Sequence, residues 1–353
     1  MCNTGVESTS QSGLKPCVDW LQVTFKTGQD SVKKCVEKLE KVFEILGLNE
    51  AEFLPLKNGK YGYKQGVAFQ GNPVLAVYYD GADDMGIHVE MTGQGCRLFE
   101  LHTSINWYEL FYRLVYEYEV NITRLDVAVD DFKGYFKINT LVKKLKDDEV
   151  TSRFKKARHI ENIVIEGGET IGHTLYFGAP SSDIQVRFYE KNVQMGMDID
   201  VWNRTEIQLR DDRAHVVAQI IADDVLPLGE IVAGLLRNYI QFRTRKATDK
   251  NKKRWPLARF WLNFLGDVQP LRIAKQMPKT SIEKKYRWID SQVSKSFFMI
   301  YYCLNEEEKQ RFIDDVLAEG ASKLTKADLQ VINQFKSKNI TYDEMIKIIR
   351  QSK

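Results

Sequence analysis

Four short segments of the sequence place charged and polar residues at every second position. Successive side chains of a β-strand point to opposite faces, so alternate positions of a strand share a face. One shared face would carry His88, Glu90 and Thr92 from 87–92, Arg124, Asp126 and Asp130 from 124–130, Arg187, Tyr189 and Lys191 from 186–191, and Arg204, Glu206, Gln208 and Arg210 from 204–210. A sheet with one solvated face also alternates, but it favours Thr, Ser and Lys over clustered acids. These residue types therefore indicate a site.

The carboxylates on this face could support phosphoryl transfer. Asp126, Asp130 and Glu206 would repel one another unless a proton or cation offsets their charge, and their oxygens suit a hard metal ion. A divalent cation with nearby arginines neutralises the charge on a phosphate while a nucleophile attacks it. The pattern thus predicts a metal-assisted reaction at a phosphate.

A tyrosine on the same face could be the nucleophile. The phenol of Tyr189 is mostly neutral at cellular pH, so Arg187, Lys191 or the metal should lower its pKa or stabilise the phenolate. The chain contains 16 tyrosines, and a strand tyrosine is more often a packing residue. The patterns alone therefore leave the nucleophile open.

Strand and helix patterns alternate along the segments that would position these residues. Strand patterns cover 19–25, 74–80, 87–93, 124–131, 173–178, 184–191 and 204–210, and helical periodicity covers 31–47, 105–119 and 214–224. This order predicts an α+β fold with a mostly antiparallel sheet and helices on one face. We expect a flexible tail over 1–15, the α+β domain over 16–242, a basic linker over 243–256 and an all-helical region over 257–353.

Composition excludes several classes of protein. The chain has 51 Lys+Arg against 48 Asp+Glu, so its net charge of +3 does not by itself indicate a polyanionic partner. The five cysteines are scattered singly, which argues against zinc ribbons, thioredoxin chemistry and a secreted disulfide framework. No apolar stretch approaches the roughly 20 residues of a membrane span, and the first residues lack an apolar signal core. We therefore expect a soluble, cytoplasmic protein.

Six motifs are spread over residues 18–290. They are DWLQVTF (19–25), HVEMTGQGCRLFE (88–100), RLDVAVDDF (124–132), HTLYFGAPSSDIQVRFYEK (173–191), RTEIQLRDDRA (204–214) and ARFWLNFLGD (258–267). This set resembles the replication initiators and relaxases of rolling-circle plasmids and integrative conjugative elements in Gram-positive bacteria. The resemblance implies a nicking-enzyme-like catalytic domain that cuts one DNA strand at an origin and transfers it, in a reaction that depends on a divalent metal.

The resemblance also assigns roles to residues of this chain. The tyrosine of the family's R-x-Y-(E/D)-K strand attacks DNA at the nick, which implies that Tyr189, between Arg187 and Lys191, forms a 5′-phosphotyrosyl intermediate. The implied metal ligands are Asp126, Asp130, Glu206 and Glu90. Better-known nicking enzymes hold their metal with a His-hydrophobe-His pair, which this sequence lacks. Carboxylate coordination of Mg²⁺ or Mn²⁺ is therefore expected.

Basic residues would bind the DNA backbone. The candidates are Arg204, Arg210, Arg245, Lys246, Lys252, Lys253 and Arg254, with a continuation at Lys284, Lys285 and Arg287. Exposed aromatic residues would stack on single-stranded bases, and Tyr61, Tyr63, Tyr78 and Tyr79 lie near Lys64 in the sequence. Solvation of the charges and core packing of the tyrosines are the competing interpretations.

The expected partners are origin DNA, partly single-stranded or in a hairpin, a host helicase bound by 257–353, and a second copy of the chain; a membrane is not expected. The helical end of the chain and the FLGD segment (264–267) favour a conjugative relaxase over a replication initiator.

Two other functions stay open. One is a catalytically silent, sequence-specific DNA-binding protein, and the other is a metal-dependent nuclease that activates water.

Overall fold

The computed structural model divides the chain into two compact units, residues 1–275 and 276–353. It describes residues 13–26, 32–82, 84–224 and 226–266 of the first unit. In the second unit it describes residues 282, 286, 289–324, 329, 332–333, 335–336 and 340–351. The predicted tail falls largely outside these ranges, but the first strand already begins at Leu14, where a tail was expected up to residue 15.

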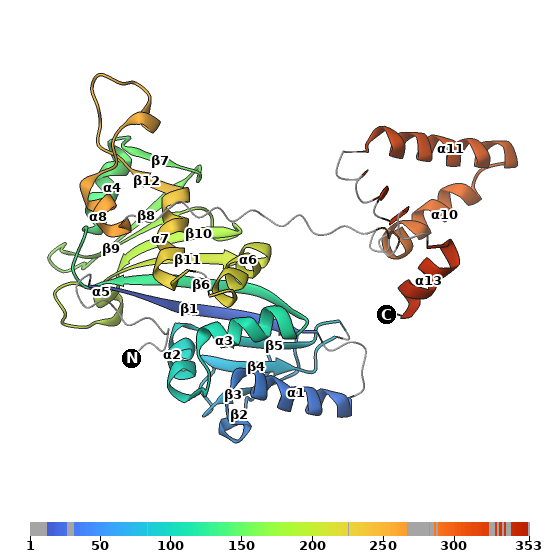
Figure 1. Ribbon diagram of the computed structural model, residues 1–353, viewed down its shortest axis with the longest axis horizontal. Helices are drawn as coiled ribbons and strands as arrows, with labels where there is room; N and C mark the ends of the chain where they lie inside the picture. Colours follow the sequence, from blue (N-terminus) through green and yellow to red (C-terminus); the bar gives the residue numbers. More distant parts are fainter. Residues whose placement is uncertain are drawn as a thin grey trace. The chain divides into compact units, whose positions relative to one another are not determined.

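A ten-stranded sheet runs through the first unit (Figure 1). Its strands lie in the order β2 (Phe53–Pro55), β3 (Gln65–Phe69), β4 (Leu75–Tyr79), β5 (Ile87–Met91), β1 (Leu14–Phe25), β6 (Val120–Asp131), β11 (Asn203–Arg210), β10 (Ile184–Glu190), β9 (Thr170–Phe177) and β8 (Ala157–Ile163). Neighbouring strands of this sheet pair antiparallel. A short antiparallel pair, β7 (Val150–Ser152) and β12 (Ile240–Phe242), stands apart from it.

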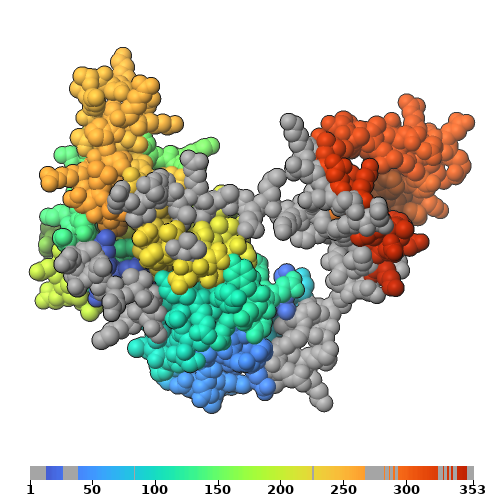
Figure 2. All heavy atoms as spheres, in the orientation of Figure 1, coloured from blue at the N-terminus to red at the C-terminus, as the bar shows by residue number. Residues whose placement is uncertain are grey.

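Helices cover one face of the sheet. They are α1 (Val32–Leu46), α2 (Gly93–His102), α3 (Trp107–Tyr112), α4 (Ile138–Lys146), α6 (Asp211–Ala222), α7 (Leu228–Tyr239) and α8 (Arg259–Leu265), with the short α5 (Lys191–Met195) at one end of β10. Apolar side chains of all the long helices join one core cluster with Val127, Ile207 and Phe188 of the sheet. Helix α6 packs on β6 and against α3, and Figure 2 shows their yellow and teal atoms side by side. The predicted α+β architecture with helices on one face is confirmed.

The alternation along the central strands decides which face is covered. Leu125, Val127 and Val129 of β6 lie in the core, and Ile207 and Leu209 of β11 join them. Side chains at the intervening positions point to the other face, because strand residues alternate. The polar residues of β6, β11 and β10 that were identified in the sequence therefore share the face without helices.

The basic segment 243–256 is not a linker between units. The amide of Arg243 donates to the carbonyl of Glu149 at 2.8 Å, and Thr244 and Pro256 are joined by a 2.9 Å backbone hydrogen bond. Trp255 is only 7% exposed, beside the short helix η3 (Lys252–Arg254). Charge density suggested an exposed connection, but the aromatic residues next to the charges anchor the segment.

Helix α8 also belongs to the first unit instead of opening the helical region. Trp261 is completely buried and packs against Phe136, Phe188 and Phe242, with ring centroids 4.9 to 6.2 Å apart. These contacts join α8 to the core of the sheet. The predicted boundary at residues 256/257 is therefore displaced to residues 275/276.

A chain ending at Lys275 is expected to keep the stability of the first unit, while a chain ending at Pro256 is not. The shorter chain loses Trp261 and Phe264 from the core, which should lower the free energy of unfolding by more than about 3 kcal/mol. Urea denaturation followed by tryptophan fluorescence would compare the two truncations with the full chain. Equal midpoints for the two truncations would contradict this placement of α8.

The second unit is helical where it is described. It contains a π-helical turn η4 (Ile289–Val293), α10 (Ser294–Tyr302), α11 (Glu306–Ser322) and α13 (Tyr342–Gln351). Asn305 and Glu308 cap α11 reciprocally, each accepting a backbone hydrogen bond from the other. Across the described parts of both units, the helices lack the combination of length and apolar character that crossing a bilayer requires.

Candidate active site

The register of the central strands brings the predicted polar residues into neighbouring rows. Across β6, β11 and β10 the paired residues form three rows, Asp126–Gln208–Gln185, Ala128–Glu206–Arg187 and Asp130–Arg204–Tyr189. Residues two apart on a strand share a face, so the three rows lie side by side on the open face. The middle row begins with a small alanine, and acidic, basic and phenolic groups surround it.

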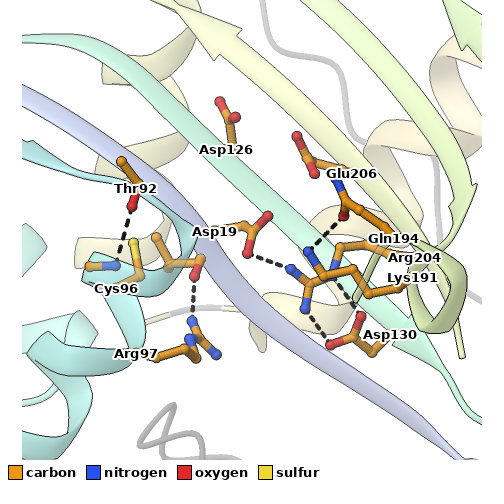
Figure 3. Close-up of polar contacts among 12 residues, drawn as sticks. Asp19, Thr92, Cys96, Arg97, Asp126, Asp130, Lys191, Gln194, Arg204 and Glu206 are labelled. Atoms are coloured by element: carbon orange, nitrogen blue, oxygen red, sulfur yellow. Dashed lines mark hydrogen bonds and ion pairs between the residues drawn. The ribbon is translucent and has the colours of Figure 1, made fainter. Parts of the chain in front are cut away.

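Arg204 connects two strands through two buried carboxylates. It is 6% exposed, and its Nε and Nη2 donate to the two oxygens of Asp130 at 2.7 and 2.6 Å. Its Nη1 donates to Asp19 of β1 at 2.5 Å. Figure 3 shows the guanidinium between the two carboxylates. The sequence pattern predicted a DNA-binding arginine here, but in the structure Arg204 is a buried ion-pair centre.

Asp19 is a site residue that the sequence pattern missed. Simple alternation would place it on the core face with Leu21 and Val23. The pairing of β1 with β6 shifts register between Val18 and Trp20, which is a bulge at Asp19. The bulge turns the carboxylate to the open face, where it meets Arg204. No strand periodicity reveals a bulge, so strand alternation gave no signal for this residue.

Tyr189, Arg187 and Glu206 form the second polar group. The Tyr189 hydroxyl donates to Glu206 Oε2 at 3.2 Å, and the same oxygen accepts from Arg187 Nη2 at 2.6 Å. The Arg187 guanidinium lies 4.3 Å from the centroid of the Tyr189 ring and covers it. Tyr189 is consequently only 3% exposed, although its hydroxyl is on the same face as the acidic residues.

The surroundings keep the Tyr189 phenol protonated. Burial, followed by the negative charge of Glu206, raises the pKa of Tyr189 well above its ordinary value of 10, and Arg187 offsets this only in part. Burial acts to raise the pKa of Glu206, but Arg187 and Arg204 together hold it below the ordinary value. The expectation that cations of the protein lower the Tyr189 pKa is therefore not met in this arrangement.

Asp126 and Lys191 border the same group. Burial raises the pKa of Asp126 to about 7, with a contribution from Glu206, although Arg124 bonds the carboxylate at 2.5 Å and opposes the shift. Burial and Arg204 lower the pKa of Lys191, whose ammonium donates to Gln194 at 3.0 Å.

The donor chemistry fits a hard cation, but the carboxylates now pair with arginines. Within the described ranges, three or more acidic, histidine or cysteine side chains do not converge as a metal-binding group. Asp126, Asp130 and Glu206 each bond a different arginine. Asp126 nevertheless feels the charges of both Glu206 and Asp19, and all three are buried. A divalent cation bound by such oxygen ligands would offset the repulsion that the arginines leave between them.

A cavity of about 560 Å³ opens above these residues. The residues that line it are Asp19, Trp20, Thr92, Gly93, Gln94, Arg97, Arg124, Tyr176, Gln185, Arg187, Lys191, Gln194, Met195, Trp202, Arg204, Glu206 and Gln208. Five of them are arginine or lysine and two are acidic, so the cavity is suited to an anion. Arg187 lines it, with Tyr189 directly beneath.

Comparison with known families shows to which family the chain belongs. Residues 15–113 match the family described as Rolling Circle replication initiation protein N-terminal domain, and residues 120–317, more than half of the chain, match Replication initiation factor. The chain belongs to the replication initiation factor family. It is also 30% identical over 323 residues to the putative DNA relaxase NicK of Bacillus subtilis (strain 168), covering 88% of this chain and 87% of that protein. As a member of this family, the chain is a DNA-nicking transesterase.

The two family regions of this replication initiation factor share one sheet. The first region ends at residue 113 and the second begins at 120, the start of β6. Strand β1 belongs to the first region, but it pairs with β5 on one side and with β6 on the other. Asp19 and Trp20 of the first region therefore line the same cavity as Arg204 and Glu206 of the second.

Glu90 lies outside the group formed by the other predicted metal ligands of this initiation factor. Its Oε1 accepts from Gln22 at 2.9 Å and from Tyr61 at 2.8 Å, and its Oε2 accepts from Lys60 at 2.7 Å. Lys60 and Tyr61 belong to the loop between β2 and β3 and hold it onto β5, whereas Gln22 belongs to the neighbouring strand β1. Glu90 thus anchors a loop in this arrangement.

Of the four tyrosines considered for base stacking, Tyr63 and Tyr78 are buried and Tyr61 is 51% exposed.

The predicted backbone-binding residues of the initiation factor are mostly exposed, but some have acidic partners. Lys252 pairs with Asp148 at 2.6 Å and Arg245 with Glu149 at 3.9 Å. Arg210 can donate to Gln208 when the Gln208 amide turns its oxygen toward the guanidinium. The others, Lys246, Lys253 and Arg254, are exposed. Lys284, Lys285 and Arg287 lie outside the described residues.

Proposed function

We propose that the chain nicks one strand of origin DNA through Tyr189 and carries the 5′ end as a phosphotyrosyl ester. The observation behind this proposal is the hydrogen bond between the Tyr189 hydroxyl and Glu206, shared with Arg187, directly below a basic cavity. A phosphate that enters the cavity attracts Arg187 away from Glu206. This movement uncovers the phenol, because the Arg187 guanidinium is what lies over its ring.

The nick exchanges one ester bond of the scissile phosphate for another. The Tyr189 oxygen attacks the scissile phosphorus while its proton passes to Glu206, which already accepts its hydrogen bond. The bond from phosphorus to the 3′ oxygen breaks, and that oxygen takes a proton from water, which the proton released by Glu206 replaces. Arg187 and Lys191 offset the charge on the phosphate oxygens. The ester keeps the energy of the original phosphodiester, so a later 3′ hydroxyl can reverse the reaction without ATP.

A divalent cation, Mg²⁺ or Mn²⁺, completes this proposal. Asp126 and Glu206 would hold it, because they are buried, close enough to raise the pKa of Asp126, and rich in oxygen ligands. Asp130 is engaged at both oxygens by Arg204, so we assign it to the arginine. When bound, the cation supplies positive charge at the reacting phosphate.

Substitution of Asp126 by asparagine is expected to weaken Mn²⁺ binding by on the order of tenfold or more, because a charged oxygen ligand is lost. Isothermal calorimetry of Mn²⁺ with the full chain, without DNA, measures this directly. Glu90→Gln is the matched control and should bind Mn²⁺ like the wild type, since Glu90 bonds the loop between β2 and β3. Equal weakening by the two substitutions would contradict the assignment.

The reaction is tested with supercoiled plasmid that carries the origin of the chain's own genetic element. Incubation with Mn²⁺ should give nicked plasmid with protein on the 5′ end, and EDTA should prevent it. A free 5′ end would instead support the second candidate, a nuclease that activates water, which the burial and raised pKa of Tyr189 favour. Binding without cutting would support a silent DNA-binding protein.

The biological role within the family is also part of this proposal. The similarity to a putative relaxase over almost the whole chain favours conjugative transfer over plasmid replication. Origin DNA is the expected substrate in either role. The host helicase and the second copy of the chain stay predictions from the sequence.

A further inference from the structure

We infer that the cavity contains a base-reading subsite, in which one nucleobase beside the scissile phosphate stacks on Trp20 and is read by Gln185 and Gln208. This inference rests on the proposed function, because it takes the bound strand to be the one that is cut. It goes further by assigning sequence preference to three residues outside the reacting group.

The three residues form one row of the sheet. Trp20 of β1 lies opposite Asp126, which lies opposite Gln208, which lies opposite Gln185. This row borders the row of Glu206 and Arg187, and Gln185 precedes Tyr189 by four residues on the same strand. At about 3.3 Å per residue the two positions are roughly 13 Å apart. A nucleotide adjacent to the phosphate on Tyr189 therefore extends toward this row.

The two amides offer one free acceptor and one free donor. Gln185 donates from Nε2 to the carbonyl of Gly178 at 3.2 Å. Its side-chain oxygen stays available to accept a hydrogen bond from a base. With its amide oriented to accept from Arg210 Nε at 3.2 Å, Gln208 retains its amino group as a donor. Both side chains line the cavity. Base edges present adjacent donors and acceptors, and glutamine is a common reader of them.

Trp20 supplies the stacking surface. Its indole lines the cavity, and the Arg124 guanidinium lies 4.1 Å from its ring centroid. Among the described residues, none accepts a hydrogen bond from its buried Nε1. Aromatic residues next to arginines are the usual platform for unpaired bases. Phosphate binding alone would need neither an indole nor two neutral amides.

The size of the cavity agrees with this occupant. Its 560 Å³ falls within the roughly 300 to 1,000 Å³ of pockets that enclose small organic ligands. Arg187 and Lys191 line the part of the cavity nearest Tyr189. The row of Trp20, Gln208 and Gln185 borders it, with Asp126 between Trp20 and Gln208 and with Arg124 over Trp20. A strand would thus place its phosphate over Arg187 and Lys191 and its base over the row of Trp20, Gln208 and Gln185.

The test measures binding without cutting, so that it does not depend on which group is the nucleophile. Full-length chain carrying Tyr189→Phe is mixed with fluorescent dA10, dC10 or dT10, and affinity is read from fluorescence anisotropy. We expect at least about a fivefold preference for one of the three oligonucleotides, as reading of a base edge implies. Gln185→Ala combined with Gln208→Ala should remove most of that preference. Gln65→Ala, an exposed amide on β3 outside the cavity, should leave it unchanged.

Trp20 is tested in the same assay. Trp20→Leu should weaken the preferred oligonucleotide by at least about fivefold, whereas Trp20→Phe, which keeps an aromatic face, should retain most of the affinity. Equal affinity for the three oligonucleotides, or a preference that survives the double glutamine substitution, would overturn the inference. If no covalent adducts form in the plasmid assay, that outcome would instead count against Tyr189 as the nucleophile. It would not affect the base preference measured in the binding assay.

Discussion

Substitution of Tyr189 by phenylalanine is expected to abolish covalent DNA adducts, with a loss of at least about 10³-fold in their rate of formation. The substitution removes one oxygen from a buried ring and leaves the packing of the strand intact. Affinity for origin DNA should change by less than about twofold, since phosphate contacts and stacking dominate binding. Labelled origin DNA, analysed on denaturing gels and by anisotropy, separates the two effects.

Tyr176→Phe is the matched control for this experiment. Tyr176 is also a phenol, it lies on the adjacent strand opposite Arg187, and it lines the cavity that Tyr189 does not reach. It should form adducts at a rate close to that of the wild type. Loss of adducts with Tyr176→Phe and their persistence with Tyr189→Phe would move the nucleophile one strand across and refute the proposal.

Replacement of Arg204 by leucine is expected to lower the free energy of unfolding by about 3 to 5 kcal/mol near neutral pH. The guanidinium neutralises Asp19 and Asp130 at once, and its loss leaves two buried carboxylates without their partner. Urea denaturation at pH 5 and at pH 7.5 measures the effect. Arg158→Leu, which removes an exposed arginine from β8, should cost less than about 1 kcal/mol.

The Arg204→Leu penalty should be smaller at low pH. Burial raises the folded-state pKa of Asp19 above its ordinary value of 3.8, and Arg204 opposes this rise. A raised folded pKa stabilises the protein below the unfolded value, and this contribution is lost as pH rises through the folded value. Without Arg204 the folded pKa moves further up, so the variant should regain stability between pH 7.5 and pH 5. A penalty independent of pH would show that Asp19 is not desolvated.

Strand alternation predicted the shared open face but not the partners within it. The positions of Asp126, Glu206 and Tyr189 follow from a period of two, which a sequence displays directly. Asp19 joins them through a bulge, and a single inserted residue has no periodic signature. Arginines were predicted as DNA contacts because charge alone does not distinguish a solvated guanidinium from one fixed between carboxylates.

The sequence also could not predict how far apart two strands lie in the sheet. Glu90 has the parity of the other acids, yet β1 separates its strand from β6. The order of strands in a sheet depends on tertiary packing, so parity alone placed Glu90 too near. The predicted domain boundary was misplaced for a related reason. Few tryptophans fix the segment around 243–265, and the many charged residues around them dominate its composition.

Strand β1 determines how far this enzyme can be shortened. A fragment that starts at Val120 would retain the whole second family region, including the tyrosine and most of the charged groups. It would also leave one edge of β6 without its neighbour, a row of unsatisfied backbone groups that invites self-association. Minimal versions for crystallography or for engineering should therefore keep the N-terminal strand, even when they discard the helices after residue 275.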